Sequence, residues 1–218
     1  MTVTISRPKC PKESWAINPD LTALIVVDMQ RAFVEQGAPF ECPGALDFVP
    51  RINELAAVCR KLNIPVIFLK AVRPADASVG LVNDLSPVPP DSEMWPIDGR
   101  RGAEFHPSLD VTDQDYIIPK IRYSALIPGS SRLEPLLRGL GRDSFIICGV
   151  ATDVCVGATT IDGMMLGFKV FFVGDLTATF NKERYQAALQ VYNIHYAKVM
   201  TFDEVMNELA LCSSERPL

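Results

Sequence analysis

The sequence predicts a three-layer α/β/α fold, in which helices cover both faces of a doubly wound, mostly parallel sheet of six strands. Short apolar runs that suit strands alternate along the chain with stretches whose apolar residues recur at helical spacing. The strand-like runs are apolar at nearly every position, which is typical of parallel strands buried on both faces. The chain has 218 residues, enough for such a sheet, and we expect residues 1–218 to form one domain.

The first half of the chain supplies a strand, a helix and a second strand. Residues 1–20 contain three prolines and are expected to form an irregular lead-in. The apolar run 22–27 stops at Asp28 and suits a central strand, and residues 46–62 have the apolar spacing of an amphipathic helix. The run 65–69 is the next expected strand, so these elements predict a βαβ unit with a right-handed crossover.

The second half continues the same alternation. Residues 115–119 suit a short strand, and because Pro119 has no N–H group, this strand should end there or lie at an edge of the sheet. The remaining elements are expected in this order: helix 133–140, strand 144–150, helix 154–166, strand 169–173, helix 183–196, strand 198–201 and helix 202–211.

The segment 73–114 interrupts this regular alternation. It carries six prolines and has no clear periodicity. A loop this long within a compact domain is usually functional, so we expect it to form a lid or a pocket wall. His106 lies in this segment and is expected to hydrogen-bond the loop rather than to bind a ligand.

Composition excludes several classes of protein. The net charge of -5 argues against a surface for nucleic acid or for an anionic membrane. The sequence has neither a stretch of about 20 apolar residues nor an apolar core of signal-peptide length near its start. Its six cysteines are widely spaced and form no Cys-x-x-Cys pair, so we expect free thiols in a cytoplasmic protein.

Three chemically active residues follow, or nearly follow, predicted strands: Asp28, Lys120 and Cys155. Because the carboxyl ends of parallel strands share one edge of a sheet, these side chains are expected to converge. At a strand-to-helix turn beside a lysine, a cysteine is expected to favour the thiolate, and a carboxylate can accept its proton. Each residue also has a structural interpretation: Asp28 as a helix cap, Lys120 as a solvated loop residue and Cys155 as part of the core.

The sequence around these residues resembles that of the isochorismatase-like cysteine hydrolases, which include nicotinamidase, N-carbamoylsarcosine amidohydrolase and ureidoacrylate amidohydrolase. Residues 24–30 read Leu-Ile-Val-Val-Asp-Met-Gln, with Phe33 just beyond, and resemble the family's first strand. Residues 119–124 resemble its lysine segment, and residues 149–156, Gly-Val-Ala-Thr-Asp-Val-Cys-Val, match the segment that bears its nucleophile. The resemblance implies an isochorismatase-like, Rossmann-like fold.

The resemblance also implies a reaction. Asp28, Lys120 and Cys155 would hydrolyse a C–N bond of a small amide or of a carbamoyl or ureido compound, through a thioester that releases ammonia or an amine. The peptide bond between Val150 and Ala151 would be cis, and the N–H groups of Ala151 and Cys155 would hold the oxyanion.

The expected substrate contacts are Phe33, Trp95 and Tyr123. Arg100 and Arg101 could suit a substrate carboxylate, but they are at least as well explained as solvated loop charges. Partners by resemblance are a small amide or ureido substrate and further copies of the chain, as a dimer or a tetramer.

No metal and no other cofactor is expected. Metal-binding nicotinamidases carry an Asp-x-His segment after the second strand, and residues 73–79 here contain no histidine. True isochorismatases, which cleave a vinyl ether, lack the nucleophilic cysteine, so Cys155 favours C–N hydrolysis over that reaction. A thiol redox protein and a catalytically idle domain of the same fold remain as alternatives.

Overall fold

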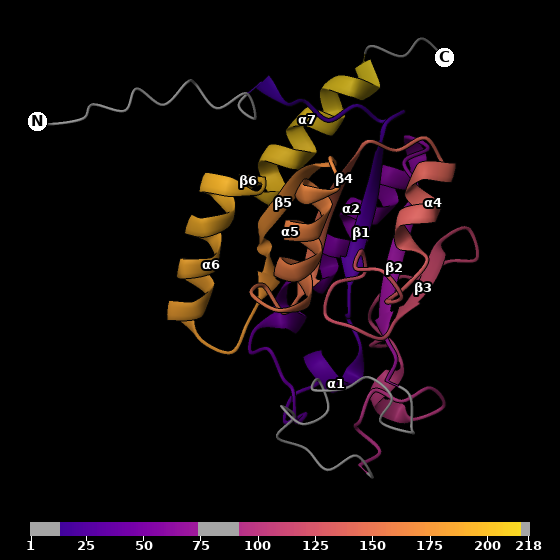
Figure 1. Ribbon diagram of the computed structural model, residues 1–218, viewed down its shortest axis with the longest axis vertical. Helices are drawn as coiled ribbons and strands as arrows, with labels where there is room; N and C mark the ends of the chain where they lie inside the picture. The colour runs from indigo at the N-terminus through magenta and orange to yellow at the C-terminus, as the bar shows by residue number, and fades with distance from the viewer. Residues whose placement is uncertain (1–13, 74–91, 215–218) are drawn as a thin grey trace, which may run out of the picture.

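The protein is described here by a computed structural model that covers residues 14–73 and 92–214. Its sheet has six parallel strands in the order β3-β2-β1-β4-β5-β6 (Figure 1). The strands are β1 (Thr22–Val27), β2 (Val66–Ala71), β3 (Tyr116–Lys120), β4 (Ser144–Val150), β5 (Lys169–Ala178) and β6 (Lys198–Met200). The expected α/β fold around a six-stranded parallel sheet is therefore confirmed.

Helices cover both faces of this sheet (Figure 1). The helical elements are α1 (Arg31–Val34), η2 (Ala45–Phe48), α2 (Val49–Lys61), η3 (Arg101–Ala103), α4 (Leu133–Gly139), α5 (Cys155–Met165), α6 (Lys182–His195) and α7 (Phe202–Ser214). Apolar residues of α2 and α7 pack in one core cluster, whereas those of α4, α5 and α6 pack in a second cluster on the opposite face. The three layers expected from the sequence are thus present.

Strand β1 shows why its sequence is apolar at every position. Leu24 and Val26 point into the core beneath α2 and α7, whereas Ala23, Ile25 and Val27 point into the core beneath α4, α5 and α6. All five side chains are fully buried. Because alternate residues of a strand face opposite sides of the sheet, a strand that is covered on both sides needs no polar residue.

Most element boundaries differ from the sequence-based expectation by one to three residues, and two of the differences have a clear structural reason. Strand β5 does not end at Val173 but continues to Ala178, beyond a register shift that pairs Gly149 with Thr177. The helix expected from residue 46 begins as the 3₁₀ turn η2, and α2 starts at Val49 with a proline in its first turn. A proline is tolerated there because the first N–H groups of a helix have no intrahelical partner.

Strand β3 lies at one edge of the sheet, as Pro119 indicated. The proline faces Lys70 of β2 in register and leaves the other side of the strand without a ladder partner. An edge position tolerates the missing N–H group of proline.

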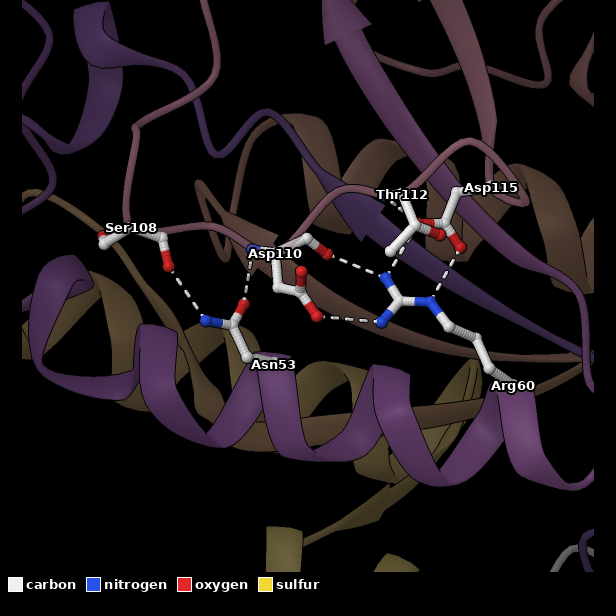
Figure 2. A network of polar contacts seen from close by, with 6 residues as sticks. All are labelled: Asn53, Arg60, Ser108, Asp110, Thr112 and Asp115. Atoms are coloured by element: carbon white, nitrogen blue, oxygen red, sulfur yellow. Dashed lines mark hydrogen bonds and ion pairs between the residues drawn. The ribbon is translucent and has the colours of Figure 1, made fainter.

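A polar network fixes the end of the long segment 73–114 against α2 (Figure 2). Arg60 donates to both carboxylate oxygens of Asp115, at 3.0 and 2.7 Å, and to the Oδ2 atom of Asp110 at 3.1 Å. Asn53, two turns earlier, donates to the carbonyl of Ser108 at 2.8 Å and accepts from the N–H of Asp110 at 2.9 Å. The expected lid function rests on residues 74–91, which lie outside the described residues, and stays a prediction.

No helix in the described ranges combines the length and apolar character needed to cross a membrane.

Candidate active site

The three candidate residues lie at the carboxyl edge of the sheet. Asp28 directly follows β1, Lys120 is the last residue of β3, and Cys155 opens α5, which follows β4 after a four-residue turn. All three side chains are buried. This burial excludes the interpretation of Lys120 as a solvated loop residue. Asp28 does not cap the helix that follows, because the N-cap of α1 is Gln30.

Asp28 and Lys120 form a buried ion pair. The Nζ atom of Lys120 lies 2.8 Å from the Oδ2 atom of Asp28, and each side chain is only 1% exposed. The ammonium also donates to the carbonyl of Arg122 at 3.1 Å. Neither carboxylate oxygen of Asp28 accepts a well-oriented hydrogen bond from the described residues. The carboxylate is therefore held mainly by charge, and its oxygens can accept a proton.

The backbone of Asp28 has an unusual conformation. Its φ angle is +51°, in the left-handed region that few residues other than glycine adopt. Aspartate is one of the residues that tolerate this region best. The turn ends β1 abruptly, and the N–H of Gln30 donates back to the carbonyl of Asp28 at 2.7 Å.

The thiol of Cys155 is affected by both charges of this pair. Burial raises its pKa to about 12, with Lys120 lowering the pKa and Asp28 raising it. For Lys120, burial disfavours the ammonium, but interactions with Asp28 first and Cys155 second outweigh this effect and raise its pKa. The expectation of a thiolate was therefore wrong for the resting site, because desolvation of the thiol exceeds the effect of the lysine. Burial therefore favours the thiol form of Cys155.

The turn that carries Cys155 has the geometry implied by the family resemblance. The peptide bond between Val150 and Ala151 is cis. Hydrogen bonds from Val154 and Val156 to the carbonyl of Ala151, both 3.1 Å long, close the turn. Cys155 then occupies the first position of α5, where backbone N–H groups have no intrahelical partner. The role of the Ala151 and Cys155 N–H groups as an oxyanion site stays a prediction.

Gly149 allows this turn to approach β1 closely. Its φ angle is +107°, and a Cβ atom there would lie 2.2 Å from the carbonyl oxygen of Val27. Val27 is the register partner of Gly149 and directly precedes Asp28. The missing side chain thus brings the strands that carry Asp28 and Cys155 into contact at their carboxyl ends.

Gln30 is a structural part of the site that the sequence did not single out. Its fully buried amide accepts from the N–H of Ala71 at 2.7 Å and donates to the carbonyls of Ala71 and Ala103, both at 2.9 Å. These bonds join the ends of β1 and β2 to η3. The glutamine stood in the matched segment 24–30, but its partners are backbone groups that no side-chain pattern reveals.

Arg73 is a second residue that the sequence left unassigned. It lies just past β2 and is 9% exposed, and its guanidinium lies 4.8 Å from the ring centroid of Trp95 and 5.7 Å from that of Phe40. Burial lowers the pKa of Arg73, whereas Tyr123, Cys155 and Asp28 raise it. A buried arginine is therefore part of the neighbourhood of the thiol.

The three expected substrate contacts occupy different environments. Trp95 is 1% exposed and packs on Phe40, with 5.6 Å between ring centroids. Phe33 is half-buried and also packs on Phe40, with 5.8 Å between the ring centroids. Tyr123 is half-buried and packs with the core beneath α4 and α5. Their contact with substrate stays a prediction.

The two loop arginines considered as carboxylate ligands have protein partners. Arg101 forms an ion pair with Glu35 and is about half exposed. Arg100 donates from its Nη1 atom to the carbonyl of Ser92 at 3.1 Å. These contacts agree with the interpretation of both residues as loop charges.

His106 hydrogen-bonds its own loop, as the sequence analysis expected. Its Nδ1 atom accepts from the N–H of Ser108 at 3.3 Å and lies 2.6 Å from the hydroxyl of that residue. Within the described part of the chain, no group of three or more His, Cys, Asp or Glu residues could hold a metal ion. The expected absence of a metal stays a prediction.

The fold and this buried carboxylate, ammonium and thiol define a class of three-layer α/β proteins in which the ends of three strands bring chemically active side chains together. The family model described as the isochorismatase domain matches residues 22–204, so the chain belongs to the isochorismatase family, a family of hydrolases.

The similarity to individual relatives extends over nearly the whole chain. Nicotinamidase 3 of Arabidopsis thaliana is 27% identical over 88% of this chain and 90% of its own length. The ureidoacrylate amidohydrolase RutB of Serratia proteamaculans is 29% identical over 95% of this chain and 90% of its own. A solved cysteine hydrolase from Pseudomonas syringae pv. phaseolicola 1448A superposes with a TM-score of 0.83 at 27% identity, covering 90% of this chain and 95% of that structure.

Proposed function

We propose that this chain is a cysteine-dependent amidohydrolase that cleaves a C–N bond of a small amide or of a carbamoyl or ureido compound. One observation carries the proposal: a thiol, a carboxylate and an ammonium are buried together at the carboxyl edge of the sheet. Each of these groups is costly to bury, and together they supply a nucleophile, a base and a compensating charge. Two relatives named above are themselves an amidase and an amidohydrolase.

The reaction begins with a neutral thiol. Asp28 accepts the proton of Cys155 while the sulfur atom attacks the carbonyl carbon, and Lys120 stabilises the negative charge that moves between these groups. The N–H groups of Ala151 and Cys155 donate to the resulting oxyanion. The C–N bond then breaks, and the departing nitrogen takes the proton from Asp28. Water hydrolyses the thioester, with Asp28 accepting one of its protons and the thiol regaining it.

Around this centre, we propose that Phe33, Trp95 and Tyr123 form the wall of the substrate pocket, either in contact with the substrate or beneath residues that touch it. No metal and no other cofactor takes part in the steps above. Stoichiometric zinc in the purified protein, required for turnover, would contradict this part of the proposal. The free thiols of the described chain suit a cytoplasmic protein.

The test is a screen for ammonia release from small primary amides, carbamoyl compounds and ureido acids. Wild type is compared with Cys155→Ala and with Cys212→Ala, a matched control, because Cys212 lies on α7 away from the sheet edge. We expect Cys155→Ala to lose turnover by at least about 10³-fold while Cys212→Ala keeps it. Full activity of Cys155→Ala would exclude the mechanism. Peroxide consumption without any ammonia release would favour the thiol redox alternative instead.

We also propose a homo-oligomer. The chain leaves several large apolar side chains exposed, among them Ile127, Met165 and Leu166, which line one hollow on the surface. Exposed apolar clusters of this kind often mark contacts between chains.

A further inference from the structure

Arg73 lies at the same sheet edge as the reaction site. It follows Ala71, the last residue of β2, by two positions. Ala71 is the register partner of Lys120, and the N–H of Val72 donates to the carbonyl of Lys120 at 2.9 Å. Strand β2 lies between β3, which ends at Lys120, and β1, which is followed by Asp28. The backbone of Arg73 therefore lies at the carboxyl edge of the sheet between these two residues.

Aromatic packing and one backbone bond hold the side chain of Arg73 in place. Its guanidinium lies 4.8 Å from the centroid of Trp95, and Phe40 contacts it from 5.7 Å. The N–H of Arg73 donates to the carbonyl of Pro96 at 2.7 Å. Trp95 itself is almost completely buried. Aromatic rings cover the face of a guanidinium and leave its N–H edge free for a planar acceptor.

One nitrogen of that edge has no hydrogen-bond partner. The Nη1 atom of Arg73 is buried and has no hydrogen-bond acceptor among residues 14–73 and 92–214, and Arg73 forms no ion pair with these residues. Arg60, by contrast, directs all of its guanidinium nitrogens to acceptors. A buried guanidinium nitrogen without an acceptor is costly, and a ligand that accepts its hydrogen bond would remove this cost.

The charged and titratable groups that face this guanidinium are those of the reaction site. They are Asp28, Cys155 and Tyr123, whose interactions with Arg73 oppose the effect of its burial. Asp28 is already paired with Lys120 at 2.8 Å. Among residues 14–73 and 92–214, the guanidinium of Arg73 therefore has no carboxylate paired with it, and one positive charge at this site remains for a bound molecule.

We propose that Arg73 is a substrate-binding residue that holds a carboxylate group of the substrate, so that this enzyme selects amides or ureido compounds with a carboxylate on the same small molecule. The inference rests on the proposed amidohydrolase function. A guanidinium binds a carboxylate through two parallel N–H···O bonds, which neither a neutral amide nor a lysine at this position would reproduce. A substrate without the carboxylate leaves the guanidinium buried and unpaired, and selectivity follows from that cost.

The experiment uses a pair of thiol reagents that differ only in this group. Iodoacetate carries a carboxylate where iodoacetamide carries a neutral amide. In both reactions the sulfur of Cys155 bonds to the CH₂ carbon, the C–I bond breaks, iodide leaves and the thiol loses its proton. The rate at Cys155 is measured by mass spectrometry of the peptide that contains it, and the iodoacetate-to-iodoacetamide rate ratio is compared between variants.

We expect Arg73→Met to lower this ratio by about 10-fold, because one good charge-assisted interaction with the carboxylate is lost. Arg73→Gln, which keeps a polar side chain without the charge, should give the same fall and replaces Arg73→Met if that variant does not fold. Arg101→Met is the matched control, because Arg101 is exposed and paired with Glu35, and its ratio should stay within about 2-fold of wild type. Equal ratios in wild type, Arg73→Met and Arg73→Gln would overturn the inference.

This readout is independent of catalytic turnover. If the amide screen fails but the ratio falls in Arg73→Met, the proposed reaction is wrong and the carboxylate site stands. If turnover is found, succinamic acid and its methyl ester form a second matched pair of probes. We then expect Arg73→Met to lower kcat/KM for succinamic acid by about 10²-fold and to leave the methyl ester nearly unchanged, and an equal loss for both probes would count against the site.

Discussion

Asp28 sets the chemistry of Cys155 in two opposing ways. As a neighbouring negative charge it raises the pKa of the thiol, and as a base it can remove the proton during attack. Lys120 offsets the first effect, because its charge lowers the pKa of the thiol. In the proposed mechanism, the thiol stays protonated and weakly reactive until a substrate carbonyl is present. Such a resting state protects a nucleophile from oxidation, because the thiolate is the reactive form.

The opposing effects can be separated with Asp28→Asn. Removing the carboxylate should lower the pKa of Cys155, so that iodoacetamide alkylates it faster at pH 8, while amide turnover falls by about 10²–10⁴-fold for lack of the base. Lys120→Met should shift the pKa of the thiol the other way, because the ammonium lowers it in wild type. The measurement is the pH profile of alkylation at Cys155. Superimposable profiles for wild type and both variants would show that the pair does not act on the thiol.

The residues that sequence reasoning found are those with a chemical signature at a strand end. Asp28 and Lys120 each end an apolar run, Cys155 lies at the turn that follows one, and each lies in a segment that matches the family. Arg73 and Gln30 have no such signature: their partners are aromatic faces and backbone groups that only the folded chain brings near. The state of the thiol could not be predicted either, because helix position and a nearby lysine are visible in a sequence, whereas the extent of desolvation is not.

At the scale of elements, the contact between β1 and β4 depends on Gly149. A side chain there would have to adopt φ near +107° and would also overlap the backbone of Val27. We expect Gly149→Ala to lower the free energy of unfolding by at least about 3 kcal/mol, because neither strand can move without disturbing the sheet. Gly141→Ala is the matched control. Gly141 has φ +68° but nothing near its Cβ position, so it should lose only about 1 kcal/mol.

Urea unfolding followed by circular dichroism measures both variants. Similar losses for Gly149→Ala and Gly141→Ala would mean that the φ angle alone, and not the approach to Val27, requires glycine at position 149.

The ion pair between Arg60 and Asp115 is the main link between α2 and the segment that leads into β3 (Figure 2). The side chain of Asp115 is 1% exposed and that of Arg60 is 15% exposed. Arg60→Ala would leave this carboxylate buried without its cation, and we expect a loss of about 2–4 kcal/mol of stability. Arg51→Ala on the same helix should lose less than about 1 kcal/mol, because its 3.7 Å pair with Asp175 is half exposed. Equal losses in thermal or urea unfolding would contradict this distinction.

The same pair predicts a pH dependence. Burial disfavours the charged form of Asp115, but hydrogen bonds from Arg60 and Thr112 outweigh it and lower its pKa below the usual 3.8. A carboxyl group whose pKa is lowered by folding stabilises the folded state above its unfolded pKa and loses this contribution as the pH falls through the folded value. The stability difference between wild type and Asp115→Asn should therefore be largest at pH 5 and above and shrink below about pH 3.8. A difference that is constant from pH 6 to pH 3 would contradict the lowered pKa.

Element types were more predictable than element limits. Buried parallel strands and amphipathic helices leave clear patterns, and Pro119 predicted that its strand would end there or lie at an edge, of which the structure shows the second. The extension of β5 to Ala178 left no such pattern, because Gly174 and Asp175 read as a break. It depends on a register shift against β4, which is a property of two strands far apart in the sequence.

For the whole molecule, topology explains why three distant segments form one site. All strands of the described sheet run parallel, so every strand delivers its following residue to the same edge. Asp28 and Arg73 follow the adjacent strands β1 and β2, and Lys120 ends β3, whereas β4 brings Cys155 from the other side of β1. The alternation of apolar runs predicts this topology class, but it does not predict the strand order, which depends on how the crossovers pack.

The proposed homo-oligomer is a prediction at this scale. Ile127 and Met165 are 46% and 71% exposed. They line a hollow of about 140 Å³ between residues 126–128, which precede α4, and the end of α5. Covering such a hollow with a second copy would remove apolar surface from water, which is the main favourable contribution to association. Light scattering should therefore give a mass that is a multiple of 24.0 kDa for wild type. Met165→Lys should shift it toward the single chain, because a buried lysine without a partner opposes association.

Leu211→Lys on α7 is the matched control, since Leu211 is similarly exposed at 66% but lies on the opposite face of the sheet. It should leave the mass unchanged. A wild-type mass of 24.0 kDa would exclude the oligomer, and a mass that responds to Leu211→Lys but not to Met165→Lys would place the contact on the face covered by α2 and α7. Because α5 begins at Cys155 and ends at Met165, the expected contact would also restrain the helix that carries the thiol.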